Sequence, residues 1–238
     1  MLGGGETSTV FLHGNKAVKY IKSEEREKYQ REVKAYQMLK GSDNILKFYN
    51  SSPPTVWHNG FILMELMEGD HYNKPIVKTY ADLVFFIKDL LSGIKYMHEA
   101  SVAHRDLKLV NLLWKKDNDR VRTKICDFGL SATGYSERVM GTIMYMAPEL
   151  VFAIETNENR GWTMDQMKRA DCYSAGLCIR EIVLQKKGIK CESINEYGFM
   201  AYIRKKEEWT DVNIIYNITN HLCNNRDLST ALQLVSQC

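Results

Sequence analysis

The longest regular pattern of hydrophobic residues in the chain lies between residues 79 and 99. Apolar side chains recur there at the three- and four-residue spacing of one helical face. Thr79 and Asp82 stand at its start with the spacing of a capping box, in which each side chain bonds the backbone of the other residue. The pattern predicts a long amphipathic helix whose buried stripe contains Leu83, Phe86, Ile87, Leu90, Leu91, Ile94 and Met97.

Shorter patterns come before this helix. Residues 17–21 and 61–66 are apolar runs of strand length, and they predict two strands. Between them lies a segment that begins with Ser23 and an acidic run, which predicts a helix capped by Ser23. The residues on the predicted inner face of this helix are Tyr29, Glu32, Val33, Tyr36 and Leu39.

Two short strands are expected around residues 112–114 and 123–126, and the pattern from Pro148 onward is mainly helical. Strands are therefore concentrated early in the chain and helices late. This order predicts an α+β fold in two lobes. We expect a small β-rich lobe over residues 1–66, a hinge over 67–72 and a larger helical lobe over 73–238.

Composition narrows the class of protein. The chain has 238 residues, of which 45% are hydrophobic, so it can bury a sizeable core. A net charge of +3 lacks the basic excess of a protein dedicated to nucleic acid or to a membrane surface. The six cysteines form no C-x-x-C pair, and no apolar run approaches bilayer length. With no signal-peptide pattern, these features predict a cytoplasmic or nuclear location.

The string that carries chemistry follows the long helix directly. Residues 104–111 read His-Arg-Asp-Leu-Lys-Leu-Val-Asn. Phosphoryl transfer needs a positioned hydroxyl, a group that accepts its proton, and cations on the phosphates. Asp106 offers the carboxylate, Lys108 offers a positive charge, and Asn111 offers an oxygen ligand for a divalent metal ion. The string therefore predicts a phosphotransfer loop.

Two further triplets follow in order. Asp127-Phe128-Gly129 comes after a short predicted strand, where a carboxylate can hold a hard cation such as Mg²⁺. Ala147-Pro148-Glu149 closes the segment that begins there. Each triplet alone is weak evidence, but their order and spacing after the catalytic string make the combination specific.

Together these motifs resemble the eukaryotic protein kinase catalytic domain over nearly the whole chain. The resemblance implies ATP as phosphate donor, Mg²⁺ or Mn²⁺ as metal cofactor, and protein substrates. It implies that Asp106 accepts the proton of the substrate hydroxyl, and that Asn111 and Asp127 hold the metal. The small size of the chain is similar to that of a minimal or viral kinase.

The resemblance extends to the start of the chain. Residues 3–10 are similar to the glycine-rich loop, although Ser8 replaces its third glycine, and the nucleotide contacts implied there are Gly3, Gly4, Gly5, Glu6 and Val10. Lys19 matches the strand lysine that pairs with the α- and β-phosphates. Glu32 matches the helix glutamate that holds this lysine, with Glu25 and Glu27 as competitors for that role.

Other nucleotide contacts follow from the same resemblance. Met64 matches the gatekeeper, and the backbones of Glu65 and Met67 match the hinge groups that bond adenine. Cys126 is expected on the inner wall of the pocket. The positions that sandwich adenine are Val10, Ala17 and Leu113, and those of the stack that aligns the lobes are Tyr36, His104 and Phe128.

Two late positions also match the family. Asp171 is expected to brace the catalytic-loop backbone, and Arg226 is expected to pair with Glu149.

The kind of kinase is indicated by two residues. Lys108 is typical of serine/threonine kinases, and Thr142 matches the threonine that contacts this lysine and Asp106. Val110 stands where many kinases that prefer basic substrates carry glutamate, and Met146 where proline-directed kinases carry arginine. Neither specificity is favoured.

Regulation is suggested by Arg105, since kinases with arginine before the catalytic aspartate often use a phosphate in the following segment. A guanidinium is well held by a doubly charged phosphate in bidentate contact. Ser136 is the expected acceptor of this phosphate, and the carboxylate of Glu137 is an alternative partner.

A different class of function stays open. Ser8 and a truncated first strand also suit a kinase-like decoy, which binds another kinase or its substrate with little activity. Retention of Lys19, Asp106, Asn111 and Asp127 favours an active enzyme. The separation between Glu149 and Asp171 is long for the family and predicts an extra loop around residues 155–161.

Overall fold

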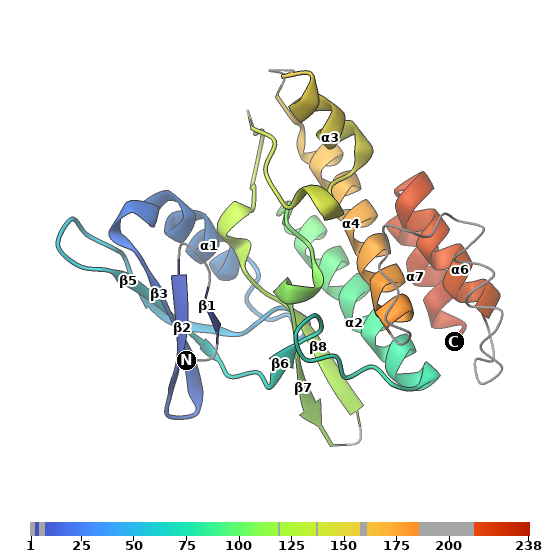
Figure 1. The fold of residues 1–238 in the computed structure, drawn as a ribbon, viewed down its shortest axis with the longest axis horizontal. Helices are drawn as coiled ribbons and strands as arrows, with labels where there is room; N and C mark the ends of the chain where they lie inside the picture. Colours follow the sequence, from blue (N-terminus) through green and yellow to red (C-terminus); the bar gives the residue numbers. More distant parts are fainter. Residues whose placement is uncertain (1–2, 5–7, 119, 137, 158–160, 186–211) are drawn as a thin grey trace.

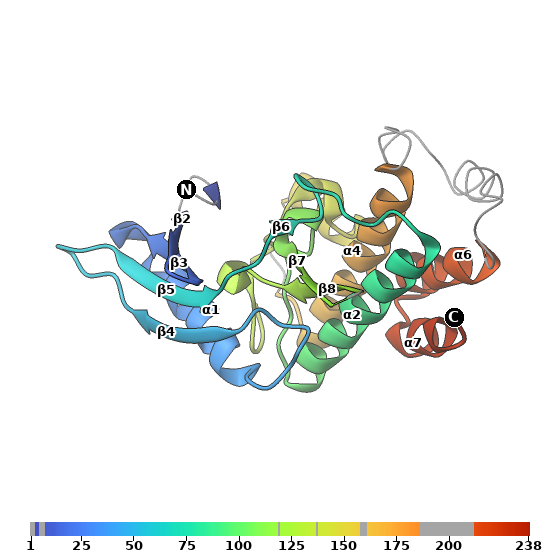
Figure 2. The ribbon, with the colours of Figure 1, turned by 90° about the horizontal axis from the view of Figure 1, so that it is seen from below.

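The chain folds into a small lobe built on a β-sheet and a larger lobe built mainly of helices (Figures 1 and 2). The structure is a computed structural model. It describes residues 3–4, 8–118, 120–136, 138–157, 161–185 and 212–238.

The small lobe contains a five-stranded antiparallel sheet in the order β1-β2-β3-β5-β4. Its central strand β3 pairs Lys19 with Val10 on one side and with Ile62 on the other. Within the glycine-rich segment, β1 pairs antiparallel with β2, with Gly3 opposite Val10. The strands are β1 (Gly3–Gly4), β2 (Ser8–His13), β3 (Lys16–Ile21), β4 (Phe48–Ser52) and β5 (Gly60–Glu65).

The single helix described in this lobe, α1 (Arg26–Met38), carries Glu32 on its buried face. The predicted cap is wrong: a 3-10 turn, Ser23–Glu25, precedes the helix, and no side chain caps it. The hydroxyl of Ser23 instead donates to the carboxylate of Glu24 at 3.3 Å. The acidic neighbours that suggested a helix start therefore compete for the hydroxyl that would have capped it.

Sequence patterning also missed β4. Its residues read Phe-Tyr-Asn-Ser-Ser, and the strand lies at the edge of the sheet with two residues exposed. An edge strand with one solvated face needs few apolar side chains, so its hydrophobic pattern is weak.

The larger lobe is organised around α2 (Tyr80–Glu99), whose predicted capping box between Thr79 and Asp82 is confirmed. Every residue of the predicted apolar stripe is buried. A second sheet, in the order β6-β7-β8, packs on this helix. Its strands are β6 (Gly69–Asp70), β7 (Leu112–Asp117) and β8 (Arg120–Ile125).

The remaining elements cover the other side of α2 or carry functional segments. Short 3-10 turns lie at Leu109–Asn111, Phe128–Leu130 and Ile143–Tyr145. The helices are α3 (Pro148–Glu155), α4 (Met164–Gln185), α6 (Val212–Asn220), a π turn (His221–Asn225) and α7 (Leu228–Ser236). None of the helices in the described part of the chain is long and apolar enough to cross a membrane.

One hydrophobic core runs through both lobes. Tyr36 and Met64 from the small lobe belong to the same buried cluster as Phe128, Leu112 and Ile94 from the large lobe. The position of the small lobe is therefore coupled to the interior of the large one. The α+β, two-lobed fold predicted from the sequence is confirmed.

His71 is a buried polar residue where the hinge segment meets the second sheet. Its Nε2 lies 3.0 Å from Thr123 Oγ1, and its ring packs on Phe86 with 4.7 Å between centroids. Its Nδ1 has no hydrogen-bond partner in the part of the chain that the structure describes. Burial lowers the pKa of His71 to about 4, although the charge of Asp70 acts in the opposite direction.

We predict that His71 makes the protein acid-sensitive between pH 6.5 and 4. His71 binds a proton more readily in the unfolded chain than in the folded one. The contribution of neutral His71 to the free energy of unfolding is therefore complete above pH 6.5 and is lost as the pH falls towards 4. The loss should be about 3 kcal/mol. Urea unfolding at several pH values should show that His71→Phe removes this part of the slope. Parallel slopes for the variant and the wild type would contradict the assignment.

Candidate functional site

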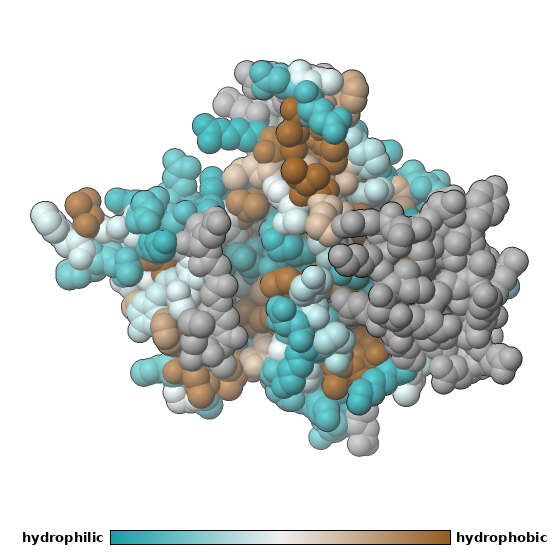
Figure 3. Space-filling view, in the orientation of Figure 1, coloured by the Kyte–Doolittle hydropathy of each residue, from teal (hydrophilic) through white to brown (hydrophobic). Residues whose placement is uncertain are grey.

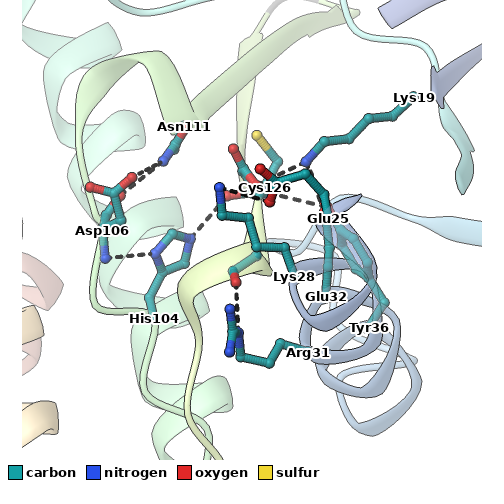
Figure 4. Close-up of polar contacts among 12 residues, drawn as sticks. Lys19, Glu25, Lys28, Arg31, Glu32, Tyr36, His104, Asp106, Asn111 and Cys126 are labelled. Atoms are coloured by element: carbon teal, nitrogen blue, oxygen red, sulfur yellow. Dashed lines mark hydrogen bonds and ion pairs between the residues drawn. The ribbon is translucent and has the colours of Figure 1, made fainter. Parts of the chain in front are cut away.

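Lys19 lies between two carboxylates at the junction of the lobes (Figure 4). Strand β3 directs its Nζ towards α1, where it contacts Glu32 Oε1 at 2.9 Å and Oε2 at 2.8 Å. The same Nζ contacts Asp127 Oδ1 at 2.9 Å. The expected pairing of Lys19 with Glu32 is therefore present in the structure, and Asp127 joins it.

Charge controls the protonation of this cluster. Burial alone would lower the pKa of Lys19, but Glu32 and Asp127 outweigh it and raise that pKa well above its usual range. Burial alone would raise the pKa of Asp127, but the ammonium of Lys19 lowers it to about 2. Lys19 is thus a fixed cation and Asp127 a fixed anion at neutral pH, and the Asp127 side chain remains 45% exposed.

Aromatic rings connect this cluster with the loop below it. Phe128 is fully buried between Tyr36 and His104, at centroid distances of 5.1 and 4.9 Å. These are the three positions expected in the stack that aligns the lobes. Sequence reasoning missed its fourth ring, Phe48 on β4, which stacks on Tyr36 at 5.9 Å, because the strand that carries it was not predicted.

Asp106 is the centre of a second group of charged side chains. Its Oδ1 accepts hydrogen bonds from the backbone N–H of Thr142 at 2.9 Å and from the Thr142 hydroxyl at 2.7 Å. Its Oδ2 pairs with Lys108 Nζ at 2.8 Å, and this Nζ also donates to Thr142 Oγ1 at 2.8 Å. The structure therefore brings together the three residues Asp106, Lys108 and Thr142, as the sequence predicts.

The backbone of this loop is held from beneath by Asp171 on α4. One oxygen of Asp171 accepts the N–H of His104 and the other accepts the N–H of Arg105, each at 2.8 Å. Arg105 has a φ of 67°, a left-handed conformation that costs about 1–3 kcal/mol in a non-glycine residue. The two charge-assisted bonds offset that cost and fix the direction in which Asp106 leaves the loop.

Asn111 has the chemistry of a metal ligand. Its amide nitrogen donates to the backbone oxygen of Asp106 at 2.9 Å, and its amide oxygen accepts no hydrogen bond from the described residues. Asp127 adds an ionised, half-exposed carboxylate. Mg²⁺ usually takes one or two protein ligands and completes its shell with phosphate oxygens and water. This donor set fits Mg²⁺.

Glu65, the last residue of β5, has a role that the sequence did not indicate. Its buried carboxylate contacts Lys124 Nζ on β8 at 2.6 Å and Lys115 Nζ on β7 at 3.6 Å. It also accepts the backbone N–H of Lys47 at 2.7 Å. Since the backbone N–H of Glu65 donates to Lys47 in turn, only the Glu65 carbonyl is a candidate acceptor for adenine.

The other predicted nucleotide contacts are distributed over both lobes. Ala17 is buried on β3 opposite Met64, whereas Leu113 lies on β7 of the large lobe. Met67 is half-buried and packs against the main core. Cys126 is buried directly before Asp127. Gly5 and Glu6 lie outside the described residues.

Two further residues complete the surroundings of the site. Arg226 pairs with Glu149 at 3.3 Å, as the sequence predicts. Arg31 on α1 was missed: its Nε donates to the Gly129 carbonyl at 3.0 Å, and its charge helps burial to lower the pKa of Arg105 to about 10. Arg31 directly precedes Glu32, so the helix that holds Lys19 also turns a guanidinium towards the loop.

A two-lobed fold with a lysine–carboxylate cluster facing a second aspartate–lysine pair defines a phosphotransfer type of site. The comparison with known families agrees: the family described as "Protein kinase domain" matches residues 1–238. The chain belongs to the protein kinase domain family.

Curated relatives are similar over part of the chain. Mitogen-activated protein kinase MPS1 of Pyricularia oryzae and mitogen-activated protein kinase mpkA of Aspergillus fumigatus are each 32% identical over 64% of this chain. Mitogen-activated protein kinase 16 of Oryza sativa subsp. japonica is 36% identical over 50% of it. These matches span only 37% of each fungal relative and 26% of the rice relative.

We predict that Cys126 is a slow nucleophile. Burial and the neighbouring Asp127 raise the pKa of its thiol well above the usual range, and the thiolate is the reactive form. Alkylation with iodoacetamide at pH 8, resolved by mass spectrometry, should modify the exposed Cys238 at least about tenfold faster. Equal rates at the two cysteines would show that Cys126 is neither buried nor shifted as described.

Proposed function

We propose that the chain is a serine/threonine protein kinase that transfers the γ-phosphate of ATP to protein hydroxyls. The observation that carries the proposal is the simultaneous presence of two groups of charges. One is Lys19 with Glu32 and Asp127, and the other is Asp106 with Lys108 and Thr142. Family membership supports the same reaction.

Each group has a separate task in this proposal. Lys19, held as a cation by Glu32, binds the α- and β-phosphates and so orients the bound nucleotide. Asp106 orients the acceptor hydroxyl and takes its proton, while Lys108 offsets the charge that develops on the transferred phosphoryl group. Thr142 fixes the positions of Asp106 and Lys108 relative to each other, because its hydroxyl forms a hydrogen bond with each of them.

Asn111 and Asp127 would hold the metal ion. Mg²⁺ supplies charge neutralisation on the phosphate oxygens when it is bound. The chain's own contribution is to keep Asp127 ionised through Lys19 and to fix the Asn111 side chain through its bond to the Asp106 backbone.

A protein is the substrate class that best explains the surface beside Asp106. Ile143 and Met144, which directly follow Thr142, are 63% and 65% exposed, and Phe152 on α3 is 60% exposed. Figure 3 shows that apolar surface gathers over α3. Large apolar side chains in water beside a polar site are typical of a surface that contacts another macromolecule. A kinase-like decoy would not need the ion pairs of Lys19 and Asp106.

We predict that Asp127→Asn abolishes turnover while the fold persists. The substitution removes the metal-binding charge and little packing, so kcat should fall by about 100-fold or more. The matched control is Asp117→Asn, which changes a half-exposed acid paired with Arg122 on the β7–β8 hairpin. Mg²⁺-dependent transfer from radiolabelled ATP to a mixed protein substrate measures both. Full activity in Asp127→Asn, or equal losses in the two variants, would refute the assignment.

We further propose that Ser136 is a regulatory phosphorylation site. Its hydroxyl accepts a hydrogen bond from Arg105 Nη1 at 2.5 Å, so a phosphate on this oxygen would lie beside a guanidinium. Arg31 adds a second positive charge to the surroundings of Arg105. Glu137, the alternative partner, lies outside the described residues.

We predict that phosphorylation of Ser136 raises activity above a basal level. A charged hydrogen bond to arginine is worth about 1.5–3 kcal/mol, so the gain should be about tenfold. The protein is incubated with ATP, the phosphate is located by mass spectrometry, and Ser136→Ala and Glu137→Gln are assayed singly and together. Wild-type turnover in the double variant, with the wild type fully phosphorylated, would show that Arg105 needs no anion from this segment.

A further inference from the structure

The segment between Asp127 and Glu149, here called the activation segment, is paired with a distant part of the chain. The N–H of Ser136 donates to the carbonyl of Trp162 at 3.1 Å, and the N–H of Trp162 donates to the carbonyl of Ser136 at 2.7 Å. Trp162 lies between α3 and α4. Beside this bridge, the Tyr135 hydroxyl lies against Gly161, where an added Cβ would overlap it.

Trp162 is also anchored on its other side. It is 2% exposed and belongs to a second hydrophobic cluster, separate from the main core. This cluster gathers residues from the catalytic loop, the end of the activation segment, α3 and α4. Its other buried members are Ala103, Met146, Ala147, Leu150, Ala153, Met167 and Ala170. The indole therefore fixes the backbone of Trp162 to the elements around Asp106.

The bridge lies between two other attachments of the activation segment to the catalytic loop. At its start, Ala132 exchanges two backbone hydrogen bonds with Ala103, each at 2.9 Å. At its end, Thr142 bonds Asp106. Between these two points, Ser136 bonds Trp162 and the side chain of Arg105, which also contacts the carbonyl of Arg138 and the sulfur of Met140.

The hydrogen-bond donors of the Arg105 guanidinium are paired with neutral acceptors in this arrangement. Its guanidinium donates to the carbonyl of Leu130 at 2.6 Å, to the hydroxyl of Ser136 at 2.5 Å and to the carbonyl of Ser131 at 3.4 Å. These acceptors lie on the activation segment itself, so the unmodified segment already provides partners for the arginine.

We infer that Trp162 is a positioning residue for phosphoryl transfer. Its backbone bridge to Ser136 and its buried indole hold the unphosphorylated activation segment where Thr142 can orient Asp106 and Lys108. Turnover is then possible before any phosphate is added, and phosphorylation of Ser136 acts on an enzyme that is already assembled. The inference rests on the proposed kinase function, because it concerns the same Asp106.

The test compares Trp162→Ala with Met167→Ala, which empties the same hydrophobic cluster from α4 without touching the bridge. Both proteins are treated with phosphatase, and melting, kinetics and amide hydrogen exchange are measured. We expect both variants to melt earlier. Only Trp162→Ala should lose about tenfold or more in kcat with KM for ATP unchanged. The reason is that the segment that orients Asp106 towards the acceptor hydroxyl is displaced, whereas the nucleotide contacts are not. Its Ser136 amide should exchange about tenfold faster or more.

A second pair of variants serves if Trp162→Ala does not fold. Ser136→Pro removes the N–H that donates to Trp162, whereas Ser136→Ala removes only the hydroxyl. The proline variant should lose more kcat than the alanine variant, and Trp162→Phe should retain most of it. Equal losses of kcat within each pair would overturn the inference if exchange is also equal, measured at the Ser136 amide in the first pair and at the Trp162 amide, which donates to the Ser136 carbonyl, in the second. A dephosphorylated wild type without turnover that gains it with phosphate would overturn it too. If no form of the wild type transfers phosphate, the kinase proposal fails, and unequal exchange within the pairs would still assign the bridge to Trp162.

Discussion

The burial of one ammonium group sets the arrangement of the whole site. An isolated charge in a protein interior is costly, so Lys19 is stable on β3 only where carboxylates surround it. Glu32 comes from α1 and Asp127 follows β8, so satisfying one cation requires the helix, the small sheet and the large lobe to meet. The buried stack of Tyr36, Phe128 and His104 then joins these elements through apolar contacts.

A similar constraint acts beneath the second group of charges. Asp171 is buried, and its two oxygens are satisfied by the backbone of the loop that presents Asp106. His98 on α2 adds a third contact to this carboxylate at 3.1 Å. The loop is therefore tied to α2 and α4 of the large lobe. The activation segment is tied to this loop through Thr142 and to the segment between α3 and α4 through Trp162. The buried carboxylates of Glu32 and Asp171 therefore hold residues of the site and at the same time join elements of the fold.

Much of this arrangement could be predicted from the sequence, because it depends on local patterns and on motifs of fixed spacing. The α2 capping box, the Lys19–Glu32 pair and the contact of Thr142 with Asp106 belong to that class. Features that depend on tertiary context could not be predicted. The edge strand β4 has a weak pattern, the partners of Glu65 come from strands distant in sequence, and Trp162 reads as an ordinary buried aromatic until its backbone partner is seen.

Lys19 is the residue that we propose as the cation that meets the phosphates of ATP. An acyl-phosphate derivative of ATP tests this role directly, because binding holds its acyl group beside the lysine nearest its phosphates. This proximity offsets the small fraction of that lysine that is uncharged. Peptide mapping after a short reaction should show Lys19 as the main modified lysine, together with Lys108 to a smaller extent, and excess Mg·ATP should suppress both. Acylation spread over exposed lysines such as Lys95, without protection by Mg·ATP and with Lys19 unmodified, would contradict the account.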